Sequence, residues 1–324
     1  MNEDGARAVL QRFGQFADQF ADCFGRSVQR DAASRYLAGL VNDSERKLIG
    51  AQVWPTSCER YLPREWAEDA DRRDAARVPT SVRFREKWRI ALAHIREVIR
   101  AGFQIEAVVA DADAGTTTGF RAALERMGLR YAVAVRGLLH AWLPGARTAE
   151  TLEAIGQALP ASAWRRVRWG RGTKRPLVAR FAARRVRLRH GRGDLWVLFE
   201  RSLADDTRKY SVLNLDATTS LKPLVRLARS RWPIEEQYRE LEDELGLDHF
   251  EGRTYPGWTH HVVLTAVAFA FLQSERRRTP DEPTPSLPAV RAWLRQIMAL
   301  MYVAGNNHLF RLAVSFHENP PLRG

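Results

Sequence analysis

Two carboxylates occupy positions at which a protein could hold a metal ion beside a phosphate. Asp111 follows the apolar run 105–110, so we expect it at the carboxyl end of a buried strand, where α/β sheets place their chemistry. Glu235 lies in the first turn of a helix that is predicted to begin at Pro233. Two arginines and a tryptophan come just before it: Arg229, Arg231 and Trp232. This combination suits a metal-binding carboxylate held next to a phosphate backbone.

Each of these residues also has an ordinary structural interpretation. Asp111 is typical of a turn at the end of a strand, and Glu235 of an acid that the helix dipole favours in a first turn. Trp232 suits either stacking on a nucleic-acid base or packing in the core. His260 and His261 are adjacent and point apart on a helix, so we interpret them as satisfied or surface histidines rather than metal ligands.

Apolar periodicity predicts the elements that would position the two acids. The run 87–101 has a helical period and is followed by Gly102, and a second helix is expected over 120–127. With strands over 105–110 and 130–135, these residues predict a β-α-β unit. Further strands are expected at 186–188, 195–199 and 210–215, and a buried helix at 262–272.

The helix that carries Glu235 is predicted to end at Gly246. Its apolar residues recur at spacings of four, three and four, which marks the side that we expect to be buried: Ile234, Tyr238, Leu241 and Leu245. Glu235, Arg239 and Glu242 share another side of the same helix.

The most basic part of the chain is residues 165–192, with twelve Arg or Lys and neither Asp nor Glu. Aromatic residues are interleaved with the cations, as in many nucleic-acid-binding surfaces. The candidate DNA contacts in this stretch are Arg165, Arg166, Arg168, Arg171, Lys174 and Arg175. We add four residues around the predicted helix: Arg229, Arg231, Trp232 and Arg239.

Composition narrows the class of protein. The chain has 324 residues and a formal net charge of +13, which favours a polyanionic partner, although an Arg-rich composition would also make every surface basic. Two cysteines, Cys23 and Cys58, provide neither a disulfide framework nor a zinc signature. The first residues show no signal-peptide pattern, and the run 262–272 is too short to span a bilayer. We therefore expect a cytoplasmic protein that is not in a membrane.

The segments 231–235, 238–241 and 245–250 resemble the carboxylate helix of bacterial insertion-sequence transposases of the DDE type. More specifically, they are similar to the group with a Tyr/Arg/Glu/Lys signature and a β insertion. The resemblance implies an α/β fold in which an RNase H-like mixed sheet is flanked by helices. It also implies a β-rich insertion and a small helical N-terminal region.

The resemblance further implies functional roles. Asp111 matches the second acid and Glu235 the third, so both would be catalytic and would bind Mg²⁺ or Mn²⁺. The implied partner is double-stranded DNA at insertion-sequence ends, and a homodimer on DNA is one assembly that the resemblance allows.

The chain departs from that pattern at several positions. Ala228 and Glu242 replace the Tyr and Lys of the signature, and Asp113-Ala114 replaces the usual Gly-Tyr. We find no apolar strand that ends in Asp between Lys47 and Arg64, so the first acid is expected to be absent and the first strands of the core incomplete.

These observations predict five parts of the chain. In order they are a helical N-terminal region at 1–60, the first part of the RNase H-like core at 61–137, the basic β-rich insertion at 138–218, the carboxylate helix with the rest of the core at 219–275, and a linker with a C-terminal helix at 276–324.

Three functions are compatible with the sequence. The first is a DDE transposase, the second a remnant that binds DNA without cutting it, and the third a basic scaffold protein whose charge reflects composition. We favour transposase ancestry and expect little or no catalysis.

Overall fold

The computed structural model describes residues 57–276 apart from 172–175, 190–192 and 206, together with 11–13, 15–16 and 19. The chain forms two compact units. The sheet unit consists of 55–73 and 79–235, and the helical unit of 1–54, 74–78 and 236–324. Each unit is described by itself, over its described residues.

Among its described residues, the sheet unit begins with α3 (Arg64–Ala67), the first four residues of α4 (Ala70–Ala75) and α5 (Lys87–Arg100). A β-α-β segment follows, made of β1 (Val108–Ala110), α6 (Ala112–Gly115), α7 (Thr118–Arg126) and β2 (Tyr131–Val135). Next come β3 (His140–Trp142), β4 (Glu150–Thr151), α8 (Leu152–Ala158) and the short 3₁₀ helix η2 (Ala161–Ala163). The unit ends with β5 (Arg165–Arg171), β6 (Pro176–Leu188), β7 (Asp194–Arg201), β8 (Arg208–Leu213) and α9 (Leu221–Arg229).

All eight strands belong to one mixed sheet, whose order is β1-β2-β8-β7-β6-β3-β4 with β5 also paired to β6. Among the described strands, β1 and β2 pair in parallel and the other neighbouring pairs are antiparallel. The predicted β-α-β unit and the predicted α/β class, a mixed sheet flanked by helices, are confirmed. The strands expected for the core and for the insertion form a single sheet, while the five proposed boundaries stay a prediction.

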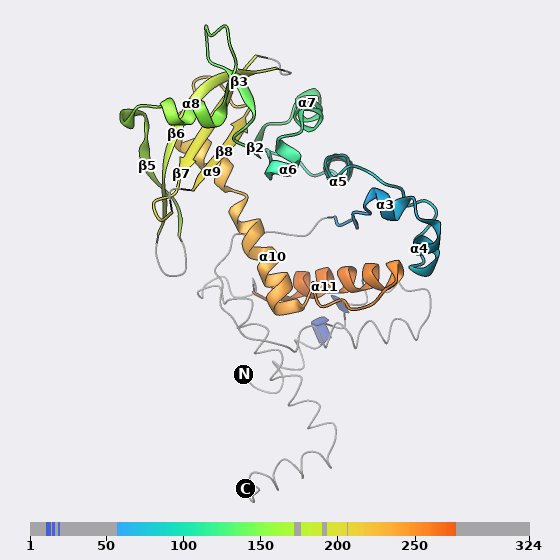
Figure 1. The fold of residues 1–324 in the computed structure, drawn as a ribbon. Helices are drawn as coiled ribbons and strands as arrows, with labels where there is room; N and C mark the ends of the chain where they lie inside the picture. Colours follow the sequence, from blue (N-terminus) through green and yellow to red (C-terminus); the bar gives the residue numbers. More distant parts are fainter. Residues whose placement is uncertain are drawn as a thin grey trace, which may run out of the picture. The chain divides into compact units, whose positions relative to one another are not determined.

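Side chains of the sheet alternate between two cores, because successive residues of a strand point to opposite faces. On one face α5, α7 and α8 cover a core that includes Leu92, Phe120, Val133, Ile155, Val197 and Phe199. On the other face α9 covers a smaller core that includes Ala132, Phe181, Leu198, Leu213, Leu224 and Val225. Figure 1 shows α8 and α9 on either side of the strands.

The basic stretch is the part in which the structure adds most to the sequence prediction. It forms the antiparallel hairpin β5–β6, and β6 extends far beyond the three residues expected at 186–188. Arginines are interspersed there with small and apolar residues: Ala179, Phe181 and Val186 are buried, while Arg180 and Arg184 are exposed. Both faces of β6 contribute to a core, Phe181 to the one beneath α9 and Val186 to the other.

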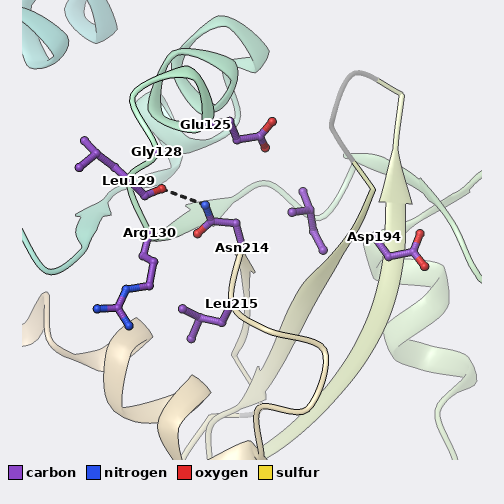
Figure 2. Close-up of a pocket in the computed structure, with 8 residues that line it drawn as sticks. Glu125, Gly128, Leu129, Arg130, Asp194, Asn214 and Leu215 are labelled. Atoms are coloured by element: carbon purple, nitrogen blue, oxygen red, sulfur yellow. Dashed lines mark hydrogen bonds between the residues drawn. The ribbon is translucent and has the colours of Figure 1, made fainter.

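A polar junction joins β2 to β8 at the end of the sheet that lies away from Asp111. The Asn214 side chain accepts a hydrogen bond from the Tyr131 backbone N–H at 2.6 Å and donates one to the Leu129 carbonyl at 2.9 Å (Figure 2). The Tyr131 hydroxyl donates to Glu125 at 2.9 Å, and burial followed by the Glu125 charge raises the pKa of Tyr131. A small pocket of about 370 Å³ lies here. Glu125, Leu129 and Asn214, which line it, already form hydrogen bonds within the fold.

The helical unit contains most of α10 (Trp232–Leu245) and the long α11 (Tyr255–Arg276). His261 is buried, and its Nε2 lies 3.0 Å from the Gly246 carbonyl oxygen and 3.2 Å from that of Leu247. This contact supports the interpretation of His261 as a satisfied histidine. Gly246 has a φ of +61°, which explains why the helix ends there.

The predicted buried stripe of α10 is wrong at Tyr238, whose side chain is 56% exposed. Leu241 and Leu245 are buried as expected. The buried side is completed by polar residues at spacings of three and four: Gln237, Glu240 and Glu244. All three interact with neighbouring groups, as buried polar side chains must. The sequence pattern missed this side because it assigned burial by apolar residue type alone.

Several predicted segments lie largely outside the described residues. Of the N-terminal region 1–60, residues 11–13 and 15–16 are helical, and the Phe13 ring lies 4.9 Å from that of Phe271. The segment 277–324, with the predicted linker and C-terminal helix, is not among the described residues. In the part of the chain that is described, no helix is long and apolar enough to cross a membrane.

The loop that carries Asp111 is held against β2 by a close approach at Gly115. A Cβ atom at this position would lie 2.0 Å from the Ala134 carbonyl oxygen and 2.8 Å from the Val133 Cβ. The buried Arg121 side chain donates from Nη1 to the Gly115 carbonyl and from Nη2 to the Thr118 hydroxyl at 3.3 Å. Burial lowers the pKa of Arg121, so the fold carries the cost of a buried guanidinium to hold α6 in place.

We predict that Gly115→Ala lowers the free energy of unfolding by at least about 2 kcal/mol, because the methyl group has to displace the backbone of β2. Gly102→Ala is the control: nothing lies within 4 Å of its Cβ position, and only the φ of +86° opposes the change. Urea unfolding of both variants tests this. If Gly115→Ala lowered the free energy of unfolding no more than Gly102→Ala does, the approach of Gly115 to β2 would not be tight.

Candidate functional site

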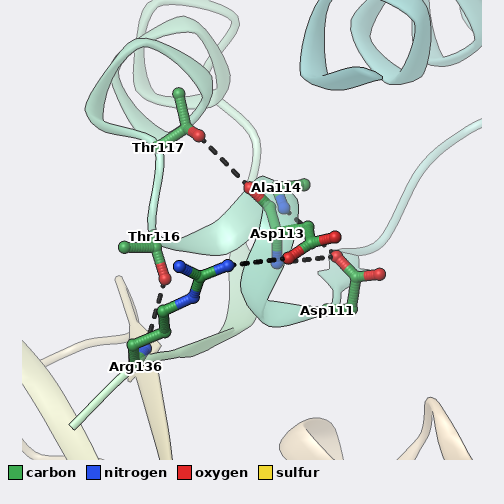
Figure 3. A network of polar contacts seen from close by, with 6 residues as sticks. All are labelled: Asp111, Asp113, Ala114, Thr116, Thr117 and Arg136. Atoms are coloured by element: carbon green, nitrogen blue, oxygen red, sulfur yellow. Dashed lines mark hydrogen bonds and ion pairs between the residues drawn. The ribbon is translucent and has the colours of Figure 1, made fainter. Parts of the chain in front are cut away.

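Asp111 ends β1 and forms the N-cap of α6. Its φ of −75° and ψ of −179° continue the extended backbone of the strand. Its Oδ1 accepts hydrogen bonds from the backbone N–H groups of Asp113 and Ala114, each at 3.1 Å (Figure 3). The strand-end position predicted from the sequence is therefore the one observed, and the carboxylate is oriented by the turn that follows it.

Next to this turn, Asp113 forms an ion pair with Arg136 at 3.2 Å (Figure 3). Both side chains are well exposed, at 59% and 68%, so the pair contributes little to stability. The Thr117 hydroxyl donates to the Asp113 carbonyl at 3.2 Å, and the Arg136 N–H donates to the Thr116 hydroxyl at 3.2 Å. The loop is thus a compact polar network with two acids two residues apart.

A cleft of about 700 Å³ opens at the end of the sheet where β7 stops. Its walls come from the β5–β6 hairpin, the β7–β8 turn and the junction between α9 and α10. The charged and aromatic side chains that line it are Arg166, Trp169, Glu200, Asp205, Lys209, Arg229, Trp232 and Glu235. Hydrogen bonds from Ser202 and Thr207 lower the pKa of Asp205 to about 2, so that acid is ionised at neutral pH.

Arg229 is the central cation of this cleft. It forms an ion pair with Glu200 of β7, and the side chains are only 17% and 12% exposed. Its guanidinium also lies 4.4 Å from the centre of the Trp169 ring. Burial lowers the pKa of Arg229 to about 10, with Glu235 opposing that shift and Arg231 adding to it. Arg229 therefore stays protonated at neutral pH.

Glu235 and Trp232 extend the same cluster onto α10. The Trp232 ring packs edge to face against Trp169, with centroids 6.0 Å apart and planes at 72°. Glu235 is exposed and pairs with Arg231 one turn earlier in the helix. Two of the three carboxylates that line the cleft, Glu200 and Glu235, thus each pair with an arginine beside a pair of tryptophans.

The register of the sheet brings Asp111 to the same end as this cleft. Strand β7 runs in the direction of β1 and β2, because antiparallel β8 lies between β2 and β7. The residues at the carboxyl ends of β1 and β7, Asp111 and Glu200, therefore share one end of the sheet. Asp111 does not line the cleft itself: β1 and β7 are three strand spacings apart, roughly 14 Å.

The donor groups do not fit a site for two divalent ions. Within the described residues, no three His, Cys, Asp or Glu side chains are grouped so that they could hold a metal ion. Asp111 Oδ1 already accepts two N–H groups, and Glu235 is paired with Arg231. Two Mg²⁺ ions need several carboxylate oxygens between them. A metal shared by Asp111 and Glu235 stays a prediction, as does the missing first acid, because residues 20–56 are not described.

Residues 48–176 match the family model for DDE superfamily endonucleases. The comparison with curated proteins gave no match. The matched part contains Asp111, the β-α-β unit and the strands through β5, and it ends where β6 begins, before Glu235. The predicted relation to DDE enzymes is confirmed at this level, and the narrower group with the Tyr/Arg/Glu/Lys signature stays a prediction.

The structure describes most of the DNA contacts proposed from the sequence, and they are not equivalent. Arg165, Arg166 and Arg168 are exposed on β5 in the DDE-matched part. Arg171 ends β5 but its side chain is not described, and Lys174 and Arg175 lie outside the described residues. Arg229, in contrast, is mostly buried and paired. Arg239 is exposed on α10 in the helical unit and has its own neighbours there.

Sequence reasoning overlooked Glu200 and Trp169, which hold Arg229 in the cleft. A signal for Glu200 was present: an acid directly follows the apolar run 195–199, the same pattern that singled out Asp111. Trp169 was noticed only as one of the aromatics among the arginines. Its partner could not be identified because Trp232 is far away in the sequence.

We predict that Glu200→Gln lowers the free energy of unfolding by about 3 kcal/mol, because it leaves the Arg229 cation buried without its carboxylate. The matched control is Asp113→Asn, which removes the acid of the exposed pair with Arg136 and should cost less than about 1 kcal/mol. Thermal and urea unfolding measure both values. A loss for Glu200→Gln no larger than that of the control would mean that Arg229 is solvated in the folded protein.

Proposed function

We propose that this chain is a transposase-like protein of an insertion sequence, which binds double-stranded DNA and whose two-acid site cleaves little or no DNA. The observation that carries the proposal is the combination of a DDE superfamily match around Asp111 with a cleft that contains Glu235 and is lined by tryptophans, arginines and a lysine. A general scaffold protein would have no reason to keep these two features at one end of its sheet.

The exposed arginines of β5 and the tryptophan rings of the cleft support DNA as the partner. The exposed arginines of β5 lead into the cleft, where Trp169 and Trp232 provide aromatic surface beside Arg229 and Lys209. Phosphate oxygens would contact the cations, and an unpaired base could stack on an exposed ring surface. The match to DDE superfamily endonucleases also supports a nucleic-acid substrate.

Electrostatics supports weak catalysis. Asp111 and Glu235 would have to hold the divalent ions that supply the charge stabilisation for DNA strand cleavage. Asp111 and Glu235 alone offer two negative charges against four positive ones, so mutual repulsion of the ions would be poorly offset. Glu242, where the signature has Lys, adds an acid where a phosphate-binding cation would be expected. As part of the same proposal, the chain binds the ends of its insertion sequence and does so as a homodimer.

The decisive experiment incubates the full chain with a supercoiled plasmid that carries the sequences flanking its gene, in Mg²⁺ and separately in Mn²⁺. We expect no metal-dependent nicking or strand transfer above the level of the Asp111→Ala variant. A duplex shift assay on the same DNA should nevertheless show binding.

Robust cutting by the wild type that disappears in both Asp111→Ala and Glu235→Ala would overturn the proposal that the site cleaves little or no DNA. Another acid would then complete the site. Asp113, which lies in the Asp111 loop, and Asp69, which accepts a hydrogen bond from the Arg72 backbone N–H at 2.9 Å, are the first to substitute. Absence of any duplex binding would overturn the proposal as a whole.

The exposed arginines of β5 generate a quantitative prediction. Replacing Arg165, Arg166 or Arg168 by Ala should weaken duplex binding equally for all sequences and reduce the slope of log K against log salt by about 0.9 each. Fluorescence anisotropy over a series of KCl concentrations measures the slope. Arg126→Ala, an exposed arginine of α7, is the control and should leave it unchanged. Unchanged slopes in all three β5 variants would show that the charge of this strand does not contribute to DNA binding.

A further inference from the structure

Four arginines lie side by side across four neighbouring strands. The pairing of β5 with β6 places Arg166 opposite Arg180, that of β6 with β7 places Arg180 opposite Arg201, and that of β7 with β8 places Arg201 opposite Arg208. Residues that are directly opposite in antiparallel strands point to the same face. The four side chains therefore form a continuous row, the arginine row, on one face of the sheet.

This face is the one that α8 covers, not the one that α9 covers. Arg180 and Ala182 are two positions apart on β6, and Phe199 and Arg201 are two positions apart on β7, so each pair points to one face. Ala182 and Phe199 belong to the core beneath α5, α7 and α8. The Arg201 guanidinium lies 4.8 Å from the centre of the Trp164 ring, which packs against that core. Glu200 and Lys209 point to the opposite face, where the Glu235 cleft lies. The arginine row is thus separate from the cleft, apart from Arg166 on the edge strand, which also lines it.

Like charges directly opposite each other in a sheet oppose folding, so the row costs stability. Burial raises the pKa of Tyr210. The Glu153 charge raises this pKa further, while Arg208 and Arg201 lower it, so Glu153 of α8 lies near the row. Arg201 and Arg208 are partly buried and interact with neighbouring groups. Arg166 and Arg180 are exposed to solvent.

We propose that the arginine row binds the phosphates of duplex DNA, as a second contact surface on the face of the sheet opposite the Glu235 cleft. The row spans three strand spacings, roughly 14 Å, which is the axial length of about four phosphates of one DNA strand. Arginine suits this role because its planar guanidinium donates two hydrogen bonds to one phosphate while its aliphatic part rests on apolar surface. The identity of the polyanion as DNA rests on the proposed function.

The test uses Arg180→Gln, Arg208→Gln and the double variant of the full chain, with a fluorescent duplex of random sequence as the probe. Each single change should reduce the slope of log K against log salt by about 0.9, and the double change by about twice that. Arg180→Gln should melt at a temperature equal to or above that of the wild type, because it removes repulsion between opposite strands. A role in folding alone would instead lower the melting temperature and leave the salt slope unchanged.

The matched control is Arg187→Gln. Arg187 is exposed on the same strand, β6, but faces Asp194 across the strand pair near the other end of the sheet. It should leave the slope unchanged, and an equal reduction would mean that total charge rather than the row determines binding. Normal slopes in both Arg180→Gln and Arg208→Gln, with normal wild-type binding, would overturn this inference alone. A wild type that fails to bind duplex DNA would overturn the proposed function with it.

Discussion

The pairing of β2 with β8 is the constraint on which the rest of the sheet unit depends. Four residue pairs, from Ala132 opposite Leu213 to Val135 opposite Tyr210, join the parallel strands β1 and β2 to the antiparallel strands that follow. The Asn214 side chain continues this junction beyond the last pair by bonding the backbone on both sides of Arg130. Without it the β-α-β unit and the long hairpins would be two separate small sheets, each with an open edge.

The consequence for the site is geometric. Since β8 lies antiparallel between β2 and β7, the carboxyl ends of β1, β2 and β7 fall at one end of a shared sheet. The loop with Asp111 and the cleft with Glu235 are brought to that end together. The junction between α9 and α10 is tied down there by Arg229, which connects β7 through Glu200 and β5 through Trp169. A rigid sheet is a suitable support for groups that must be held to within a fraction of an ångström.

The lining of the cleft balances three cations, Arg166, Lys209 and Arg229, against three acids, Glu200, Asp205 and Glu235. Glu200 pairs with Arg229 and Glu235 with Arg231, so under the proposed function an incoming phosphate would compete with these carboxylates. Such an exchange replaces one ion pair by another, and its net energy is smaller than a count of arginines suggests. The exposed arginines of β5, which need no such exchange, are then the natural source of the salt-dependent part of binding. The superfamily match, which includes β5 but ends before Glu235, is consistent with this division of roles.

The sequence by itself determined the local elements and the place of Asp111. The helix that Gly102 follows, the stop at Gly246 and the β-α-β unit are all marked by neighbouring residues, because caps and apolar periods act within a few positions. It also pointed to the basic stretch and to Glu235 near the start of α10. The tertiary structure alone decided that Glu200 neutralises Arg229, that Trp169 meets Trp232, that Tyr238 faces outward and that Arg166, Arg180, Arg201 and Arg208 form one row. These outcomes depend on strand register and on which side of a helix finds a partner, and both are set by contacts between residues far apart in the chain.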